Sequence, residues 1–474
     1  MKNFNKAKGS ILVYTLIIIT IVSIFLTASL KVVVSNIQFG INRESKEESL
    51  QIAEAGVYFY RWYLAHQVAG LTKKQIRQFW ASGTAYGVGT AYEDDFNGVG
   101  AYSIEVIPPT SNSTIVIAQI TGWTYKTPEL KRIIKVRFRQ PSWSEYSVLC
   151  DSDIRFGEDT NVYGPLHSNG GIRFDGVAHN VISSGLATYN DPDHFGADEF
   201  GVHTHDIPVD PLPPSAVPAH SDVFMAGREF PAPVKDFNSV VSDIADMKSE
   251  AGCPNVGSVC TGDVNGMSSS ANGIYFNNAN YGRHIVLRTD GTMRVYRVTN
   301  YNTTSNDWTN QSSYTSYAIP NDGIIFVEDN VWIDGQINGK RVTVVAADLS
   351  GGGSKDIFIK NDLLYTNYDG SDIIGLVAQR NIDVTRGSEE DLRIDGALLA
   401  QSGRIGREQF SSSYNRDVIT VNGSLVTKLR YGFAYTDGTG YINRNLIFDN
   451  NLLYYPPPYF PTGTDYAIDS WEEL

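Results

Sequence analysis

The chain has 474 residues, enough for two or three domains. Its formal net charge of −14 at pH 7 argues against a nucleic-acid partner, because proteins that bind nucleic acid carry basic patches. Its three cysteines form no Cys-x-x-Cys pair, which excludes a zinc ribbon.

The chain begins with a short basic leader followed by a long apolar run. The leader carries Lys2, Lys6 and Lys8, and residues 11–30 contain no charged side chain. About twenty helical residues, at roughly 1.5 Å each, span the roughly 30 Å hydrocarbon core of a bilayer. The pattern predicts a transmembrane helix, with the lysines holding the N-terminus in the cytoplasm and the bulk of the chain outside.

Two simpler interpretations of this segment stay open. A cleaved signal peptide has an apolar core of roughly 7–15 residues and a small-residue cleavage site after it. Here the run is longer, and Lys31-Val32-Val33-Val34 follows it. A plain membrane anchor is the other interpretation.

The residues after the apolar run are predicted to continue it as an amphipathic helix. Apolar side chains recur three and four positions apart at Leu50, Ala53, Val57, Tyr60 and Leu64. The opposite face is charged, so one side of this helix is expected to pack on other elements of the chain.

The layout resembles that of type IV pilin-like proteins, and Ala53-Glu54-Ala55-Gly56 is similar to a signature of PilX-type pilus assembly proteins. The resemblance implies that a prepilin peptidase cuts between Gly9 and Ser10. It also implies that the helix stays on the mature protein and packs among other pilins or pseudopilins.

One residue departs from the pilin pattern. Counted from Ser10, the fifth residue is Tyr14, where ordinary pilins carry Glu. An ionisable residue within a bilayer is costly unless it is paired, so its absence removes a pairing constraint. This departure favours a low-copy minor pilin over a major filament subunit.

The next elements are predicted to form a small antiparallel sheet. Thr72-Lys73-Lys74-Gln75 is a capping-box pattern that opens a short helix. Strand-like runs follow at 102–107, 115–120 and 133–138, separated by Pro- and Gly-containing turns. A long helix on such a sheet is the α+β arrangement that the resemblance to pilins also implies.

Beyond Pro141 the sequence pattern changes to short apolar runs, many of them ended by Asp-Gly or Asn-Gly. Examples of the apolar runs are 324–327, 341–347 and 373–378, and Asp334-Gly335 and Asp395-Gly396 are examples of the turn dipeptides. Near-continuous apolar runs are typical of buried parallel strands, which favours a parallel β-solenoid, or β-helix. A β-sandwich stays open as an alternative, because Asp-Gly and Asn-Gly also form hairpin turns.

An insertion is predicted to interrupt this solenoid at 190–320. It contains a Pro-rich linker, a helix near 234–250, a cysteine loop and a hairpin. Cys253 and Cys260 are close enough in sequence to close a small disulfide loop in an oxidising exterior.

The insertion also carries residue types that bind metals. His194, His203, His205 and Asp206 form the candidate set, with further acidic residues between them. Zinc and similar divalent ions take His together with carboxylate ligands. The spacing matches no known signature, so a solvated loop remains the alternative and no cofactor is expected.

The sequence thus predicts a minor pilin-like structural subunit, single-pass in the cell membrane, with a large exterior β domain for assembly or adhesion. The alternative is a surface enzyme or glycan-binding protein on a pilin-like anchor. No enzyme is expected, because Asp334 and Asp395 each precede Gly in turns. Expected partners are other pilins, prepilin peptidase and the inner or cytoplasmic membrane, without nucleic acid.

The predicted divisions are a leader (1–9), a transmembrane helix (10–34), an amphipathic helix with an antiparallel sheet (35–140), the first part of the solenoid (141–189), an insertion (190–320), the main solenoid (321–450) and a Pro/Tyr-rich acidic tail (451–474).

Overall fold

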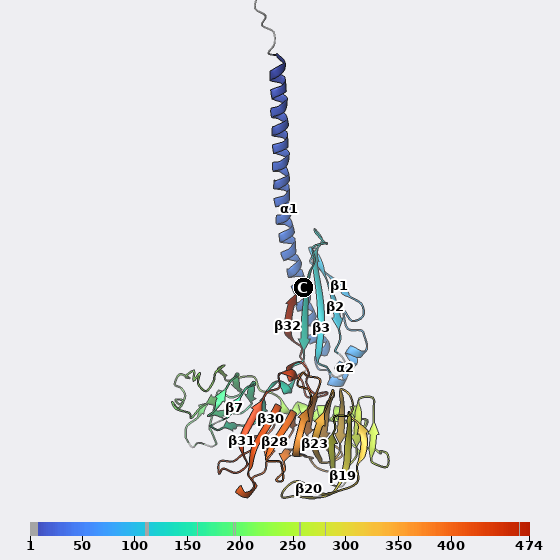
Figure 1. Ribbon diagram of the computed structural model, residues 1–474, viewed down its shortest axis with the longest axis vertical. Coiled ribbons are helices and arrows are strands. Elements are labelled where there is room, and N and C mark those ends of the chain that lie inside the picture. The colour runs from blue at the N-terminus through green and yellow to red at the C-terminus, as the bar shows by residue number, and fades with distance from the viewer. Residues whose placement is uncertain are drawn as a thin grey trace, which may run out of the picture.

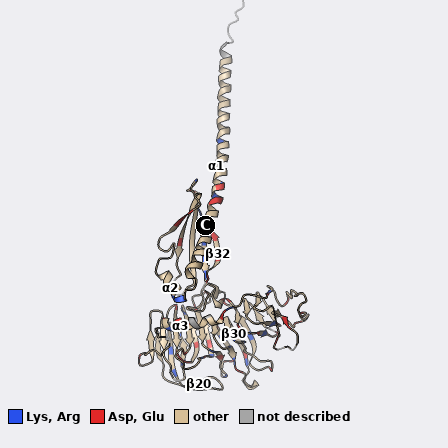
Figure 2. Cartoon of the chain, turned by 180° about the vertical axis from the view of Figure 1, so that it is seen from behind, with Lys and Arg blue, Asp and Glu red and all other residues tan. Residues whose placement is uncertain are grey.

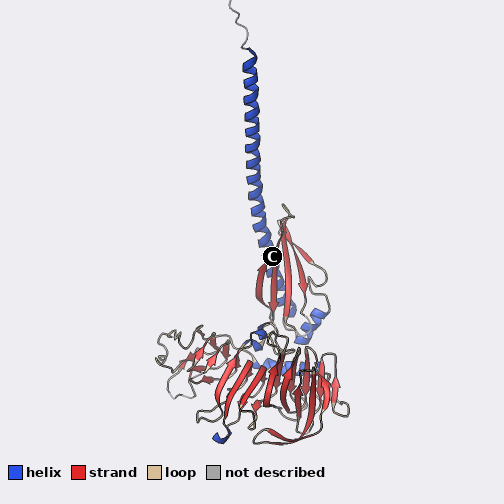
Figure 3. Cartoon of the chain, viewed as in Figure 1, coloured by secondary structure: helices blue, strands red, loops and turns tan. Residues whose placement is uncertain are grey.

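The computed structural model describes residues 8–474 except 110–112, 159, 193, 195, 256, 280 and 464. Residues 1–7 of the predicted leader therefore lie outside the described residues. A long helix projects from a small sheet, and a broad region of parallel strands lies beyond that sheet (Figure 1). Strands dominate everything that follows the long helix (Figure 3).

The long helix α1 (Lys8–Val68) has two halves with different surroundings. Residues 11–40 are exposed along their whole length. Further on, one face is buried, and the predicted positions Ala53, Val57, Tyr60 and Leu64 are fully buried. The predicted apolar spacing is therefore the spacing of the face that packs on the sheet.

The sheet beside α1 is antiparallel, as predicted, in the order β1-β2-β3-β4-β32. The short helix α2 (Lys73–Ala81) precedes it, and the Thr72–Gln75 capping box forms. The strands are β1 (Tyr92–Phe96), β2 (Gly100–Ile107), β3 (Ile115–Thr124), β4 (Arg132–Arg139) and β32 (Ala467–Glu473).

The last strand corrects the prediction of a tail at 451–474. β32 pairs antiparallel with β4, so the parallel region is inserted between two neighbouring strands of the small sheet. Asp469 bonds Arg139 across this pair, and Tyr466 accepts a hydrogen bond from Trp80 of α2. The strand was missed because its side chains are mostly exposed, so it lacks the apolar alternation that marks a half-buried strand.

Most of the remaining strands belong to one 22-stranded sheet, in which the longest run of pairings is parallel. In stacking order this run is β17 (Gly273–Phe276), β22 (Gly323–Val327), β24 (Arg341–Ala346), β26 (Ile373–Ala378), β28 (Asp391–Ala400), β30 (Arg416–Thr427), β5 (Val148–Cys150), β8 (Leu166–Ser168), β11 (Ile182–Ser184) and β15 (Arg228–Glu229).

Further parallel ladders flank this run. They comprise β18 (Arg283–Leu287), β23 (Val331–Ile337), β25 (Ile357–Tyr365), β27 (Ile382–Val384) and β29 (Ile405–Arg407); β31 (Tyr441–Ile447), β7 (Asn161–Val162) and β10 (Val177–Ala178), which follow β30; and β6 (Ile154–Phe156), β9 (Ile172–Phe174) and β14 (Val202–His203).

The other elements are antiparallel strands and short helices. They are β12 (Thr188–Tyr189), β13 (Glu199–Phe200), β16 (Met267–Ser269), β19 (Thr292–Asn302), β20 (Asp307–Gln311), β21 (Thr315–Ala318), α3 (Val240–Glu250), and the 3₁₀ helices η1 (Trp143–Glu145), η2 (Phe237–Ser239), η3 (Ser412–Tyr414) and η4 (Asn450–Leu453).

Stacking order differs from chain order. The chain enters the stack in its middle, where β5 pairs with β30, and advances to β15 at one end. It then crosses by way of α3 to β17 at the other end and returns through β22–β30. In Figure 1 the labelled strands of this stack and of the flanking ladders lie in the order β7, β31, β30, β28, β23 and β19.

This path changes the predicted boundary of the insertion. Strands β14, β15, β17 and β18 lie within 190–320, yet they pair in parallel with strands of the stack. The predicted hairpin is present, because β18 pairs antiparallel with β19. The parallel pairings were missed because β14 and β15 are two-residue strands, and β17 and β18 pair with β22 and β23, about fifty positions further along the chain. The segment is therefore partly an end of the stack.

Helix α3 lies across the outer face of the strands (Figure 2). Its apolar residues Val240, Ile244 and Met247 share a core with strand residues such as Phe326 and Val345. Ion pairs from Lys73 to Asp243 (2.6 Å) and from Arg77 to Glu250 (3.1 Å) join α2 to α3. The small-sheet module and the parallel region are thereby linked at this face as well as through the chain.

Candidate functional site

The outer half of α1 exposes large apolar side chains from Ile11 to Phe39. Of the described residues, only α1 offers a helix long and apolar enough to cross a membrane, with a window of mean hydropathy 2.6 that is 0% buried. The charged residues of α1 gather toward the sheet, whereas its outer half is almost entirely uncharged (Figure 2). Contiguous apolar surface of this extent marks a contact with membrane or protein.

The Ala53-Glu54-Ala55-Gly56 motif lies where α1 meets the sheet. Ala53 and Gly56 face the strands, while Glu54 and Ala55 are partly exposed. A Cβ atom at Gly56 would lie 2.8 Å from Ile120 Cγ2 and 3.0 Å from the Tyr102 ring. The small residues of the motif therefore allow α1 to approach the sheet closely.

Gly9 and Ser10, the predicted cleavage site, are the second and third residues of α1. Tyr14 lies one turn further and is 65% exposed. Cleavage at this point stays a prediction.

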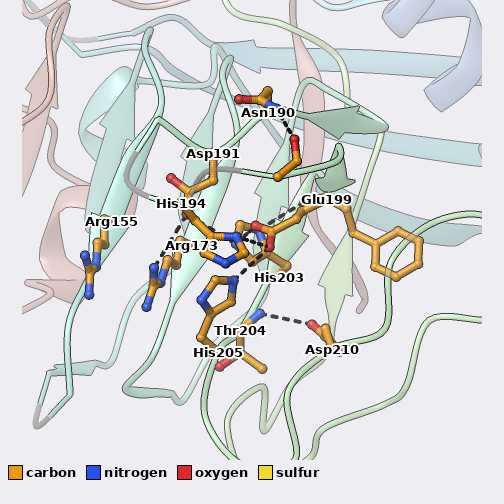
Figure 4. A network of polar contacts seen from close by, with 12 residues as sticks. Arg155, Arg173, Asn190, Asp191, His194, Glu199, His203, Thr204, His205 and Asp210 are labelled. Carbon is orange, nitrogen blue, oxygen red and sulfur yellow. Dashed lines mark hydrogen bonds and ion pairs between the residues drawn. The ribbon is translucent and has the colours of Figure 1, made fainter.

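A second candidate site is a cluster of histidines and carboxylates at the β15 end of the stack (Figure 4). Asp191 follows β12, Glu199 begins β13, and His203 ends β14. One ligand atom from each of Asp191, Glu199, His203 and His205 lies within 4.8 Å of the others. The antiparallel β12–β13 pair and the parallel β9–β14 pair place them together.

Glu199 is the centre of this cluster. Its Oε2 lies 2.5 Å from His203 Nε2, and its Oε1 lies 2.9 Å from His205 Nε2 and 3.1 Å from His194 Nδ1. Asp191 Oδ2 is 3.6 Å from His203 Nε2. Two carboxylates therefore face imidazole nitrogens in one small volume.

Burial sets the electrostatics of the cluster. The side chain of His203 is 1% exposed, and burial lowers its pKa, which favours the neutral imidazole. Burial, followed by the negative charge of Asp191, raises the pKa of the neighbouring Tyr189 hydroxyl. The site thus combines low water access with negative potential.

The cluster contains three of the four residues that the sequence singled out. His203 and His205 are candidate ligands, and His194 contacts Glu199 from a half-exposed position. Asp206 is exposed and accepts a hydrogen bond from the Ile207 backbone, so it lies outside the set. Asp191 was missed, because only the turn after β12 brings it back to the histidines.

Comparisons with known proteins add little to this geometry. No family model matches the chain, and no curated protein matches it. A solved structure described as "Crystal structure of competence-associated pilin ComZ from Thermus thermophilus" aligns with a TM-score of 0.33 and 12% identity, covering 91% of this chain and 98% of that one. At this TM-score and identity the alignment does not establish a shared fold.

The other residues that the sequence analysis named, Cys253, Cys260, Cys150, Asp334 and Asp395, are bonded or buried within the protein. Cys253 and Cys260 form a disulfide with Cα atoms 5.7 Å apart, and Cys150 is buried. The Asp334 carboxylate contacts His284 and Asn361, each at 3.0 Å. Asp395 accepts hydrogen bonds from Tyr365, Tyr368 and Arg393, so both carboxylates are engaged within the protein.

Proposed function

We propose that this chain is a minor pilin-like subunit of a type IV pilus or a related filament or secretion system. The observation that carries the proposal is the division of α1 into an exposed apolar half and a half packed on a small antiparallel sheet. In this proposal the apolar half lies in the membrane before assembly and among the helices of other pilins afterwards.

The parallel region is proposed to be a β-solenoid displayed outside the cell. Support comes from the ladders, in which successive strands pair in parallel and contribute apolar residues to one continuous core. Its insertion between β4 and β32 attaches it to the small sheet by two chain connections. Such a double attachment suits a domain that is presented in a fixed position for assembly or adhesion.

Processing by prepilin peptidase between Gly9 and Ser10 is part of the proposal. Tyr14 in place of the usual acidic residue favours a low-copy position, such as a filament tip. No enzymatic activity is proposed, and the internal hydrogen bonds of Asp334 and Asp395 support that choice.

The proposal is tested by mass spectrometry of the mature N-terminus in the native host. The expected N-terminus is Ser10, and Gly9→Val should leave the leader uncut, whereas Gly40→Ala, at an open position on the same helix, should be processed normally. An intact leader on the wild-type protein would overturn the pilin interpretation.

A second experiment tests the role in a filament. Deleting the gene should reduce the number of filaments in a sheared surface fraction, and the wild-type gene should restore it. Normal filament numbers after deletion, or turnover of a polysaccharide by the purified full chain, would instead favour the surface enzyme.

A further inference from the structure

We infer that Asp191, Glu199, His203 and His205 form a binding site for one divalent first-row transition-metal ion, with Zn²⁺ as the expected occupant. The four donor atoms lie within 4.8 Å of one another and come from three places in the fold. Two imidazoles with two carboxylates are a ligand set that suits zinc.

The decisive contact is that between His203 and Glu199. His203 Nδ1 lies 3.3 Å from the backbone oxygen of Phe200, and because a carbonyl only accepts, this contact places a proton on Nδ1. Nε2 is then the ring nitrogen that is available to bind a metal ion. It faces Glu199 Oε2, another acceptor, at 2.5 Å.

Neither of these two atoms has a hydrogen-bond partner within the part of the chain that the structure describes. Their side chains are 1% and 7% exposed, so bulk water does not satisfy them. Buried acceptors that face each other are costly unless a proton or a metal ion lies between them. A metal ion would bind both His203 Nε2 and Glu199 Oε2. It would also bind His205 Nε2, which lies 2.9 Å from the other carboxylate oxygen of Glu199.

The charges around the cluster agree with a divalent cation. Asp191 and Glu199 supply two carboxylates, and metal ions bind imidazole in its neutral form, so a divalent ion held by these four side chains is balanced in charge. Arg173 lies 3.7 Å from Asp191, but its Nε donates to Asp175, which also accepts from the His205 backbone N–H. Arg155 Nη2 also lies 3.8 Å from Asp175, so this carboxylate offsets part of the charge of the two arginines. Asp175 also orients His205, as residues behind a metal site usually do.

Histidine ligands argue against calcium and magnesium, which take oxygen ligands. His194 is 49% exposed, and its Nδ1 lies 3.1 Å from Glu199 Oε1. It covers the cluster on the solvent side and is in reach as an additional ligand.

The position of the site indicates what the ion would do. β14 is the last strand of the β6–β9–β14 ladder. Arg228 of β15, at the end of the stack, donates a hydrogen bond to the backbone oxygen of Val202 in β14. Terminal units of a stacked β domain have a neighbour on one side only and need another source of stability. An ion held by Asp191, Glu199, His203 and His205 would tie Asp191, which follows β12, to this terminal strand.

The test uses the full chain in detergent, without a polyhistidine tag, after dialysis against EDTA. Zn²⁺ is added, and bound metal is measured by mass spectrometry and titration calorimetry, with Mg²⁺ and Ca²⁺ in parallel. We expect one Zn²⁺ per chain, no comparable binding of Mg²⁺ or Ca²⁺, and a visible absorption band of a His-ligated site when Co²⁺ is used.

His205→Ala and Glu199→Gln should each weaken zinc binding by more than the roughly 10- to 100-fold that loss of an outer partner causes. His179→Ala and His66→Ala, at histidines elsewhere, should leave it unchanged. His205 is partly exposed, so its variant is expected to fold, and circular dichroism checks this. Zinc binding that is absent from the wild type, or equal in His205→Ala and in the controls, would overturn the site.

Discussion

The contact between α1 and β3 can be tested at one glycine. Gly122 lies on β3 opposite the helix, and a Cβ atom there would lie 2.4 Å from Ser49 O, 2.5 Å from Ala53 N and 3.0 Å from Ala53 Cα. All three are backbone atoms of α1, so no side-chain rotation relieves the contact. Gly122→Ala therefore has to push the helix away from the sheet.

The size of the effect follows from this geometry. Ordinary van der Waals contact begins near 3.4 Å, so the closest pair has to open from 2.4 Å by about 1 Å. A gap of that size forfeits a quarter to a half of the dispersion energy of the atoms lining it. Together with the usual cost of overpacking, we expect a loss of about 2–3 kcal/mol in the stability of the helix–sheet packing.

Hydrogen exchange measures this loss locally. Protection of the α1 amides between residues 49 and 64 should fall by roughly 30- to 150-fold, because about 1.4 kcal/mol corresponds to a factor of ten. Gly157→Ala is the matched control, since a Cβ atom there has nothing within 4 Å and the backbone is not left-handed. Unchanged protection in Gly122→Ala would refute the account of how α1 is held, and with it the packing role given to Ala53 and Gly56.

Three further outcomes are expected. Lys248 and Glu328 form an ion pair with both side chains 0% exposed, so Lys248→Met should lower the free energy of unfolding by about 3–5 kcal/mol. The double variant Lys248→Met with Glu328→Leu should lose clearly less, because it leaves no unpaired buried charge. Thermal unfolding measures both losses, and equal losses would contradict this. Burial, together with the nearby negative charge of Glu408, raises the pKa of Asp383 to about 7. Between about pH 4 and 7 the folded state therefore holds a proton that the unfolded state has released, so stability should fall as the pH rises through this range. Asp383→Asn should remove that fall, and a variant with the wild-type pH profile would disprove it. Gly40→Ala, at an open helical position, should stabilise α1 by about 0.5–1 kcal/mol, seen as slower exchange around residue 40.

Sequence patterns identified the N-terminal part of the molecule well, because its signals are local. The apolar run, the three- and four-residue spacing of Ala53, Val57, Tyr60 and Leu64, and the Thr72 capping box each act within a few turns of helix. The antiparallel strands β2–β4 are consecutive, so their pairing also follows chain order.

The cluster at the β15 end was predicted in part for the same reason. His203 and His205 are two positions apart, and His194 is near them in the chain, so composition alone drew attention to them. The choice of carboxylates depended on folding. The Asp206 side chain accepts a hydrogen bond from the backbone N–H of the next residue, Ile207, whereas the β12–β13 pair places Asp191 beside the histidines.

The amino-acid sequence by itself determined the membrane-length helix, the face on which it packs and the strand-rich character of the rest. Only the tertiary structure decided that Ala467 pairs with Arg139, that Val148 stacks beside Leu425, and that the chain fills its stack from the middle. The physical reason is that these contacts join residues hundreds of positions apart. The strands pair through backbone hydrogen bonds, which are the same for every side chain. Which strand pairs with which therefore depends on the path of the whole chain.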